Sequence, residues 1–190
     1  MKKSVGANAF ALPTPVWVVG TYDENGEPNI MTAAWSGICC SKPPCVAVSL
    51  QKIRSSYNNI IKHKAFTISI PSQQYMIEAD YIGIFSGKKV DKFAVTGLNA
   101  VRSELVDAPY VKEFPLILEC RLIHTIELGL HTQFIGEIMD VKVDEDALGD
   151  NSLPSIGKIN PFVYSFPELK YYAIGQEVGK AFSVGAKLGK

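Results

Sequence analysis

The sequence predicts a mainly β protein, a barrel or a sandwich of short strands with a few helices beside it. Apolar residues make up 47% of the 190 residues, which is enough for one domain with a sizeable core. Short β-rich runs alternate with turn signals along most of the chain. Two long β-type runs, 115–127 and 132–143, follow one another closely and are expected to pair as a central ribbon. We therefore expect residues 1–190 to form a single domain.

The first half of the chain supplies four further strands. Residues 15–22 form a β-rich apolar run, and residues 28–35 are the expected returning strand. Asn25-Gly26 between them is a strong hairpin signal. Residues 46–50 alternate between two faces, and residues 65–70 form a strand that a proline ends.

Two serine-capped helices are expected beside these strands. The first covers residues 55–63 and is capped by Ser55 or Ser56, and the second runs from Ser72 to about residue 84. Apolar residues recur at helical spacing in the second segment.

Loops and closing strands complete the chain. Residues 86–93 are a polar, basic loop or helix start, and an irregular stretch follows to residue 114. Residues 151–161 are expected to be a loop, and 162–166 and 171–174 the last strands. The tail, about residues 175–190, is expected to lie on a partner subunit or to remain loose.

Composition excludes several classes of function. Lys plus Arg and Asp plus Glu number 19 each, so no net charge attracts nucleic acid or an anionic membrane. No apolar run reaches the roughly 20 residues that span a bilayer, and the N-terminus lacks a signal-peptide pattern, which indicates a cytoplasmic protein. The chain has no P-loop, no G-x-S-x-G elbow and no G-x-G-x-x-G after a strand.

The four cysteines fit no common zinc spacing, and we expect no metal site. The simplest interpretation of Cys39, Cys40, Cys45 and Cys120 is free thiols buried in strands. A redox or metal role for the first three remains an alternative.

A phosphate site is the first candidate for chemistry. At residues 49–57 a strand ends and a helix begins, with Ser55 and Ser56 beside Arg54 and Lys52. Hydroxyls, cations and helix N–H groups would converge there on an anion. The alternative is an ordinary capped helix with solvated basic residues.

Residues 29–35 are the second candidate. Small residues between Asn29 and Trp35 would let a flat ring approach the backbone, and Asn29 and Thr32 could meet its polar edges. The alternative is a central strand with Trp35 in the core.

Two further features remain open in the same way. Lys88, Lys89 and Lys92 could bring positive charge to a phosphate or simply form a solvated face. His131 lies at a Gly-flanked bend between the two long strands, where it faces a pocket rim or is a surface turn residue.

In order along the chain, these segments resemble the flavin reductase-like FMN-binding family, most closely its flavoredoxin branch. The resemblance extends from Pro13 to Leu188. It is carried by PVWVVGT at 15–21, NIMTAAW at 29–35, PPCVAVSL at 43–50 leading into RSSY at 54–57, DKF at 91–93 and LHTQFIGEI at 130–138.

The resemblance implies a six-stranded FMN-binding split barrel with flanking helices, normally a homodimer with the flavin near the subunit interface. It also implies a role for thirteen residues. Those expected along the flavin ring are Asn29, Thr32, Ala33 and Trp35, with main-chain contacts from Ser49, Leu50 and Gln51. Those expected at the phosphate are Arg54, Ser55, Ser56 and Lys92. His131, the candidate catalytic residue, and Tyr164 are expected to close the pocket.

The function expected from the resemblance is that of an FMN-dependent oxidoreductase of the flavin reductase type, with NADH or NADPH as the donor. The cofactor would carry the hydride chemistry, and the protein would position and tune it. One alternative is a non-enzymatic electron carrier between protein partners. Another is a module that only stores flavin or binds another ligand.

Overall fold

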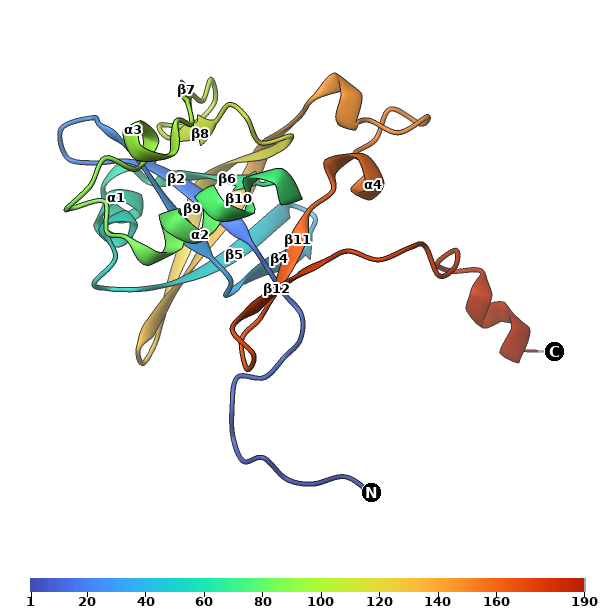
Figure 1. Cartoon of the computed structure of the whole chain (residues 1–190). Helices are drawn as coiled ribbons and strands as arrows, with labels where there is room; N and C mark the ends of the chain where they lie inside the picture. Colours follow the sequence, from blue (N-terminus) through green and yellow to red (C-terminus); the bar gives the residue numbers. More distant parts are fainter. Residues whose placement is uncertain (190) are drawn as a thin grey trace.

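A seven-stranded antiparallel sheet, in the order β3-β2-β6-β9-β10-β5-β4, forms the centre of the computed structural model, which describes residues 1–189 (Figure 1). Its strands are β2 (Trp17–Tyr22), β3 (Pro28–Ala33), β4 (Ser36–Ser41), β5 (Pro44–Gln51), β6 (Ala65–Ile70), β9 (Leu116–Leu128) and β10 (His131–Val143). The expected central ribbon is confirmed, because β9 and β10 pair along nearly their whole length.

The sheet curls around one apolar core. Buried residues of this core come from β3 and β5, near opposite edges of the sheet, and from the strands between them. They include Val19, Met31, Val46, Val48, Phe66, Ile68, Leu118 and Phe134. Within residues 1–189 the edge strands β3 and β4 do not pair with each other, so the barrel stays open on that side. The architecture is the predicted split barrel, with β4 as an additional edge strand.

A second apolar layer covers the outer face of β2, β3 and β9. It is formed by α2 (Met76–Ile84), α3 (Lys92–Thr96) and the segment 97–114, which contains the paired strands β7 (Ala100–Arg102) and β8 (Pro109–Val111). Its buried residues are Val18, Ile30, Ile82, Phe93, Leu98, Val111, Phe114 and Ile117. Successive strand residues point to opposite faces, and Ile117 and Leu118 accordingly belong to the two different cores.

The predicted serine caps are wrong. Helix α1 (Ser55–His63) covers the predicted residues, but Arg54 is its N-cap residue and makes no side-chain cap bond. Ser72 precedes a 3-10 turn, η1 (Gln73–Tyr75), that leads into α2, and its hydroxyl caps nothing. Both first-helix serines lie inside α1, where the Ser56 hydroxyl turns toward buried side chains of the barrel.

Several other elements lie where the sequence pattern was weak. Strand β4 has no buried residue, so it carries no alternating signal and was not predicted as a separate strand. The irregular stretch before residue 114 contains β7 and β8, which are only three residues each. The region predicted as a loop at 151–161 contains the one-turn helix α4 (Ile156–Ile159), which follows the 3-10 turn η2 (Glu145–Ala147).

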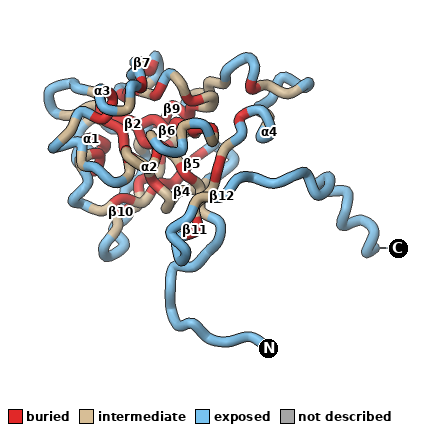
Figure 2. Tube along the Cα trace, in the orientation of Figure 1, coloured by how far each residue is buried: buried red, intermediate tan, exposed pale blue. Residues whose placement is uncertain are grey.

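A three-stranded sheet of β1 (Thr14–Pro15), β11 (Phe162–Ser165) and β12 (Lys170–Ala173) packs beside the barrel and confirms the two predicted closing strands. Residues 1–13 and 175–189 are exposed and extend away from the body (Figures 1 and 2). The last of these contain the 3-10 turn η3 (Val184–Leu188). No helix within residues 1–189 is long and apolar enough to cross a membrane.

We expect Gly20→Ala to destabilise the fold, because a Cβ at this position of β2 would overlap the carbonyl oxygen of Pro109 and the hydroxyl of Thr67. Overpacking of this kind costs about 1–3 kcal/mol of unfolding free energy. Gly37→Ala in β4 is the matched control, since a Cβ there meets nothing within 4 Å. Urea unfolding of the two variants measures the difference, and equal midpoints would contradict the close packing of β2 under β8.

Candidate functional site

A hollow of about 380 Å³ opens where β3, β5 and β10 meet the three-stranded sheet. Its volume falls within the range of small-molecule sites, about 300–1,000 Å³. It is lined by Met31, Thr32, Ala33, Ala34, Trp35, Ser49, Leu50, Gln51, Arg54, Leu130, His131, Tyr164 and Phe166. Trp35 and Phe166 meet edge to face, with ring centroids 5.1 Å apart, and form an aromatic wall. The hollow therefore offers a mostly apolar surface with a few polar groups at its margin.

Hydrogen bonds fix the backbone around this apolar hollow. The Ser49 N–H donates to the Trp35 carbonyl at 2.8 Å, and the Gln51 carbonyl accepts from the Arg54 N–H at 3.0 Å. His131 at the start of β10 is the register partner of Gln51 at the end of β5. The bend that carries His131 is thus held against the same strand end that leads into Arg54.

A second hollow, of about 750 Å³, is polar. It is lined by the β2–β3 turn, one side of α1 and the segment 87–93, and it includes Asp23, Glu27, Asn29, Ser55, Asn58, Asn59, Lys62, Lys88, Lys89, Asp91 and Lys92. Because the consecutive residues Arg54 and Ser55 line one hollow each, the two hollows are neighbours at the beginning of α1.

Where the two hollows adjoin lies a group that we call the anion corner, formed by Arg54, Ser55 and Lys92. Lys92 is only 5% exposed, and its ammonium donates to the carbonyls of Ile30 at 2.7 Å and Ile82 at 2.8 Å. An ammonium has three donors, so one N–H remains for a ligand. The Ser55 hydroxyl is buried and has no hydrogen-bond partner in the structure.

The electrostatics of the anion corner favour a negatively charged ligand. Burial, followed by the neighbouring positive charge of Arg54, lowers the pKa of Lys92 to about 8. An anion between the two cations would offset both effects. The N-terminus of α1 adds the positive end of the helix dipole at the same point.

Ser56 belongs to a buried hydrogen-bond network and not to the anion corner. Its hydroxyl accepts from Asn29 Nδ2 at 3.0 Å and from the Thr21 hydroxyl at 3.5 Å. The Asn59 amide in turn donates to the Thr21 hydroxyl at 3.1 Å. This network ties α1 to β2 and β3 and so fixes where the anion corner lies.

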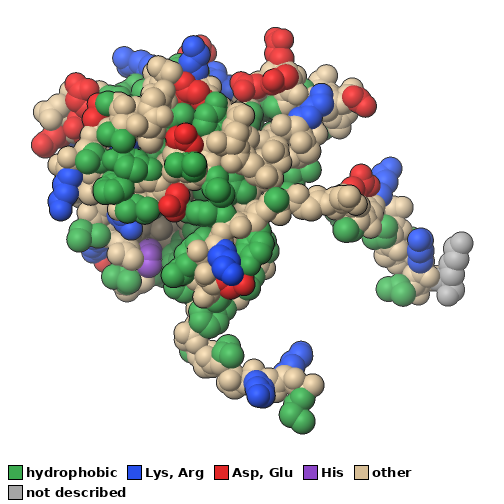
Figure 3. All heavy atoms as spheres, viewed as in Figure 1, with side chains coloured by type: hydrophobic (Ala, Val, Ile, Leu, Met, Phe, Trp, Pro, Cys, Tyr) green, Lys and Arg blue, Asp and Glu red, His purple; other side chains and the backbone are tan. Residues whose placement is uncertain are grey.

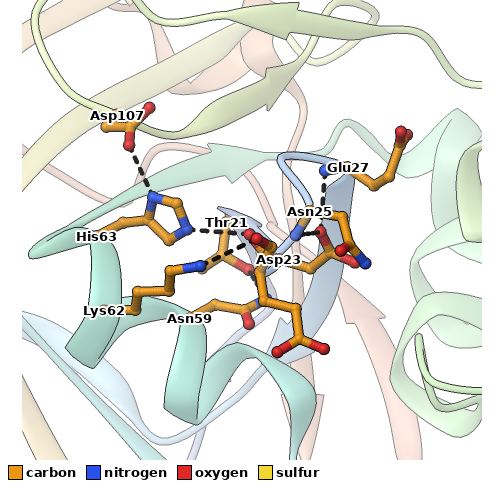
Figure 4. Close-up of polar contacts among 9 residues, drawn as sticks. Thr21, Asp23, Asn25, Glu27, Asn59, Lys62, His63 and Asp107 are labelled. Carbon is orange, nitrogen blue, oxygen red and sulfur yellow. Dashed lines mark hydrogen bonds and ion pairs between the residues drawn. The ribbon is translucent and has the colours of Figure 1, made fainter.

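The turn between β2 and β3 forms one wall of the polar hollow. Figure 4 shows the hydrogen bonds that hold this turn. The Asp23 carboxylate accepts from the backbone N–H groups of Asn25 at 2.8 Å and Glu27 at 3.0 Å. His63 stands between the Asp23 carbonyl, at 3.0 Å, and the Asp107 carboxylate, at 2.7 Å. The turn is thereby held to the C-terminal end of α1 and to the loop before β8.

A family model described as a flavin reductase-like domain matches residues 9–172, which covers most of the barrel and both hollows. The chain belongs to this family.

Solved structures agree with the family assignment. Flavoredoxin of Desulfovibrio vulgaris (Miyazaki F) is 57% identical, covers 97% of this chain and 100% of its own, and superposes with a TM-score of 0.93. Flavoredoxin from Methanosarcina acetivorans is 30% identical, covers 99% of each chain and has the same TM-score. An FMN-binding protein from Thermus thermophilus shares the fold, with a TM-score of 0.80 at 20% identity over 95% of this chain and 97% of its own.

Two curated relatives match over shorter stretches. An uncharacterised protein from Archaeoglobus fulgidus is 32% identical over 115 residues, which are 60% of this chain and 65% of that protein. The match to a protein from Aeropyrum pernix spans 56% of that protein's length.

Within this family fold, nine of the thirteen predicted site residues line the apolar hollow. They are Thr32, Ala33, Trp35, Ser49, Leu50, Gln51, Arg54, His131 and Tyr164. Asn29, Ser55 and Lys92 line the polar hollow instead, and Ser56 lines neither. Thr32 also has a packing role, because its hydroxyl donates to the Ala79 carbonyl of α2 at 2.5 Å.

Four residues of the apolar hollow were not predicted: Met31, Ala34, Leu130 and Phe166. Met31 and Ala34 lie inside the predicted ring-lining segment, so its continuity was the available signal. Leu130 is an exposed apolar residue in a turn, which is a weak sign of a pocket rim. Phe166 follows β11, and only the fold brings it to Trp35.

The two neighbouring serines should respond oppositely to substitution. Ser56→Ala leaves the buried amide of Asn29 without its acceptor, and we expect a loss of about 1–3 kcal/mol in unfolding free energy. Ser55→Ala removes a buried hydroxyl that has no partner, so stability should stay the same or rise. Urea unfolding of the ligand-free protein measures both, and a larger loss for Ser55→Ala would contradict this assignment.

Proposed function

We propose that this protein binds FMN and acts as an oxidoreductase of the flavin reductase type, with NADH or NADPH as the hydride donor. The observation that carries the proposal is the junction of an apolar hollow with an anion corner. A flavin mononucleotide joins a flat apolar ring system to a phosphate by a short chain, and in this protein the apolar hollow lies next to the anion corner. The family assignment and the FMN-binding protein among the structural neighbours support this ligand.

The residues of the apolar hollow fit the flavin ring. Thr32, Ala33 and Trp35 would lie along it, and the strand end at Ser49, Leu50 and Gln51 would offer main-chain groups at its polar edge. Trp35 with Phe166 would exclude water from one side of the site. Tyr164 of β11 would close the hollow within the same chain.

The anion corner fits the phosphate. A phosphate monoester carries close to two negative charges at neutral pH and above. Arg54 and Lys92 would supply matching charge, and the unpartnered Ser55 hydroxyl would donate to a phosphate oxygen. Ser56 would act through the network that holds α1, and Asn29, as its partner, would position the same end of the site.

Bound FMN would supply the redox chemistry, since it can take up a hydride and pass electrons on. The chain's own residues would bind, orient and shield it. His131 lies at the rim of the apolar hollow, where its imidazole can hydrogen-bond to an incoming hydride donor or electron acceptor. We propose His131 as the residue that contacts the reacting molecules.

An electron carrier is the second candidate function. The 57% identity over nearly the whole chain to a protein named flavoredoxin favours it. In this reading electrons arrive from and leave for redox proteins, and no nicotinamide nucleotide is needed. A module that merely stores flavin is the third possibility, and it would hold FMN without redox turnover.

A homodimer is proposed as the working assembly. Exposed apolar residues gather over α2 and around the three-stranded sheet (Figure 3). They include Met76, Ile77, Ile84, Phe85, Leu169 and Tyr172. The exposed tail at 175–189, which carries Phe182 and Leu188, would lie against the second subunit. Light scattering of the full chain tests the homodimer. The same measurement on a chain that ends at residue 174 tests whether the tail contributes to it.

The function itself is tested by adding FMN and then mixing the complex anaerobically with NADH or NADPH. We expect a bound-flavin absorbance spectrum that bleaches on mixing, with a slower rate in His131→Ala. A spectrum that changes only with dithionite would favour the carrier. Failure to bind FMN would overturn both redox functions and flavin storage, and would leave only a module that binds another ligand.

The pH dependence of FMN affinity should reveal the titration of the Lys92 ammonium. The pKa of Lys92 in the free protein is about 8, so above this pH Lys92 is mostly neutral. It must then take up a proton when FMN binds, because the charged ammonium is the form that pairs with the phosphate. Affinity should therefore fall by about tenfold per pH unit above pH 8. The unfolding free energy of the free protein should change in the opposite sense and rise with pH between about 8 and 10.5. In this range Lys92 binds more protons in the unfolded chain than in the folded one, and stability therefore increases as the pH rises.

Fluorescence titration with FMN from pH 7 to 9.5 measures this profile. Lys92→Met should bind FMN weakly and without the pH step. Lys88→Met is the matched control, because Lys88 is an exposed lysine of the same polar hollow, and it should keep the step. A step that persists in Lys92→Met would assign the titration to another group.

A further inference from the structure

Three of the four cysteines meet at the hairpin between β4 and β5. Cys40 of β4 is the register partner of Cys45 of β5, next to the turn pair Ser41 and Pro44. The register shifts between Ile38 and Cys40, so Cys39 is the extra residue of a β-bulge. Directly opposed residues of an antiparallel pair have Cβ atoms about 4.5–5.5 Å apart, and a disulfide needs about 3.5–4.5 Å, so the closest such pairs reach the spacing of a disulfide.

The thiols of this cluster differ in accessibility. Cys40 is exposed and Cys45 is buried, with its Sγ 3.4 Å from the Pro43 carbonyl oxygen. Burial raises the pKa of the Cys45 thiol, and the adjacent Cys40 and Cys39 thiols raise this pKa further. The predicted burial of all four thiols is therefore wrong for Cys39 and Cys40, because β4 is an edge strand whose last residues face solvent.

This cluster lies outside both hollows. Cys45 is near the start of β5, whereas Ser49, Leu50 and Gln51, which line the apolar hollow, are at its other end. Within residues 1–189, no group of three or more His, Cys, Asp or Glu side chains has the arrangement of a metal site. The pairing of one exposed and one buried thiol across two strands is instead suited to thiol–disulfide exchange.

We propose that Cys40 and Cys45 form a reversible cross-strand disulfide by exchange with small-molecule disulfides. The exposed Cys40 thiolate attacks one sulfur of the small disulfide, which releases one thiolate and leaves a mixed disulfide on Cys40. The Cys45 thiol then loses its proton to water, attacks the Cys40 sulfur and releases the second thiolate. Two protein thiols are oxidised, and one small disulfide is reduced to two thiols. The site does not depend on the proposed flavin function.

Exposure of the full-length protein to oxidised glutathione tests the proposal. We expect two of the four thiols to disappear, a mass loss of two hydrogen atoms and no retained glutathione, all reversed by dithiothreitol. Lys42 precedes Pro43, so trypsin should leave Cys39, Cys40 and Cys45 in one peptide whose mass reports the internal bond. A covalent dimer, or glutathione that stays on the wild-type protein, would overturn the proposal.

Matched variants assign the partners. Cys39→Ser should still lose two thiols, because the bulge residue is not in register with Cys45. Cys40→Ser should form no internal disulfide and should at most retain glutathione on Cys39. Cys120→Ser is the control. Cys120 is fully buried in β9 and should not react, so this variant should lose two thiols as the wild-type protein does. An internal disulfide in Cys40→Ser would show that another thiol pairs in place of Cys40 and would reject this pairing.

Discussion

The pairing of β9 with β10 is the interaction on which the rest of the structure depends. Each strand has 13 residues, and together they join β6, β2 and β3 on one side to β5 and β4 on the other. The apolar hollow takes Thr32 from the first set and Gln51 from the second, so the ribbon helps to hold its two walls in place. Gly136 of β10 allows Phe66 to pack directly on this strand, because a Cβ there would lie 2.5 Å from the Phe66 ring in the barrel core.

Much of the fold could be predicted because its strands are amphipathic and its turns carry strong signals. Residues 15–22 and 28–35 were expected as a hairpin about Asn25-Gly26, and β2 and β3 pair there. Where burial gives no pattern, prediction failed, and β4, with six residues and none buried, is the clearest case. Register was also out of reach, since nothing local shows that Cys40 opposes Cys45 across a bulge.

The candidate site was predictable in its members and less so in their arrangement. Nine of the expected residues line one hollow because they lie at strand ends that the ribbon brings together. The two serines at the start of α1 are equivalent in sequence, but a helical step of about 100° separates their side chains. Ser55 therefore reaches the anion corner, whereas Ser56 turns to Asn29. The packing of α1 against β2 and β3 therefore gives the two serines different surroundings.

The same contrast explains how ligand and fold are coupled. The network around Ser56 and Asn59 is satisfied in the free protein and holds α1 in place. At the anion corner, by contrast, Ser55 has no partner and Lys92 is buried beside Arg54, which destabilises the folded state. An anion that satisfies these groups binds the folded chain alone and so must stabilise it. The site is thus built at a cost to the free protein, and occupation of the anion corner should raise the midpoint of unfolding.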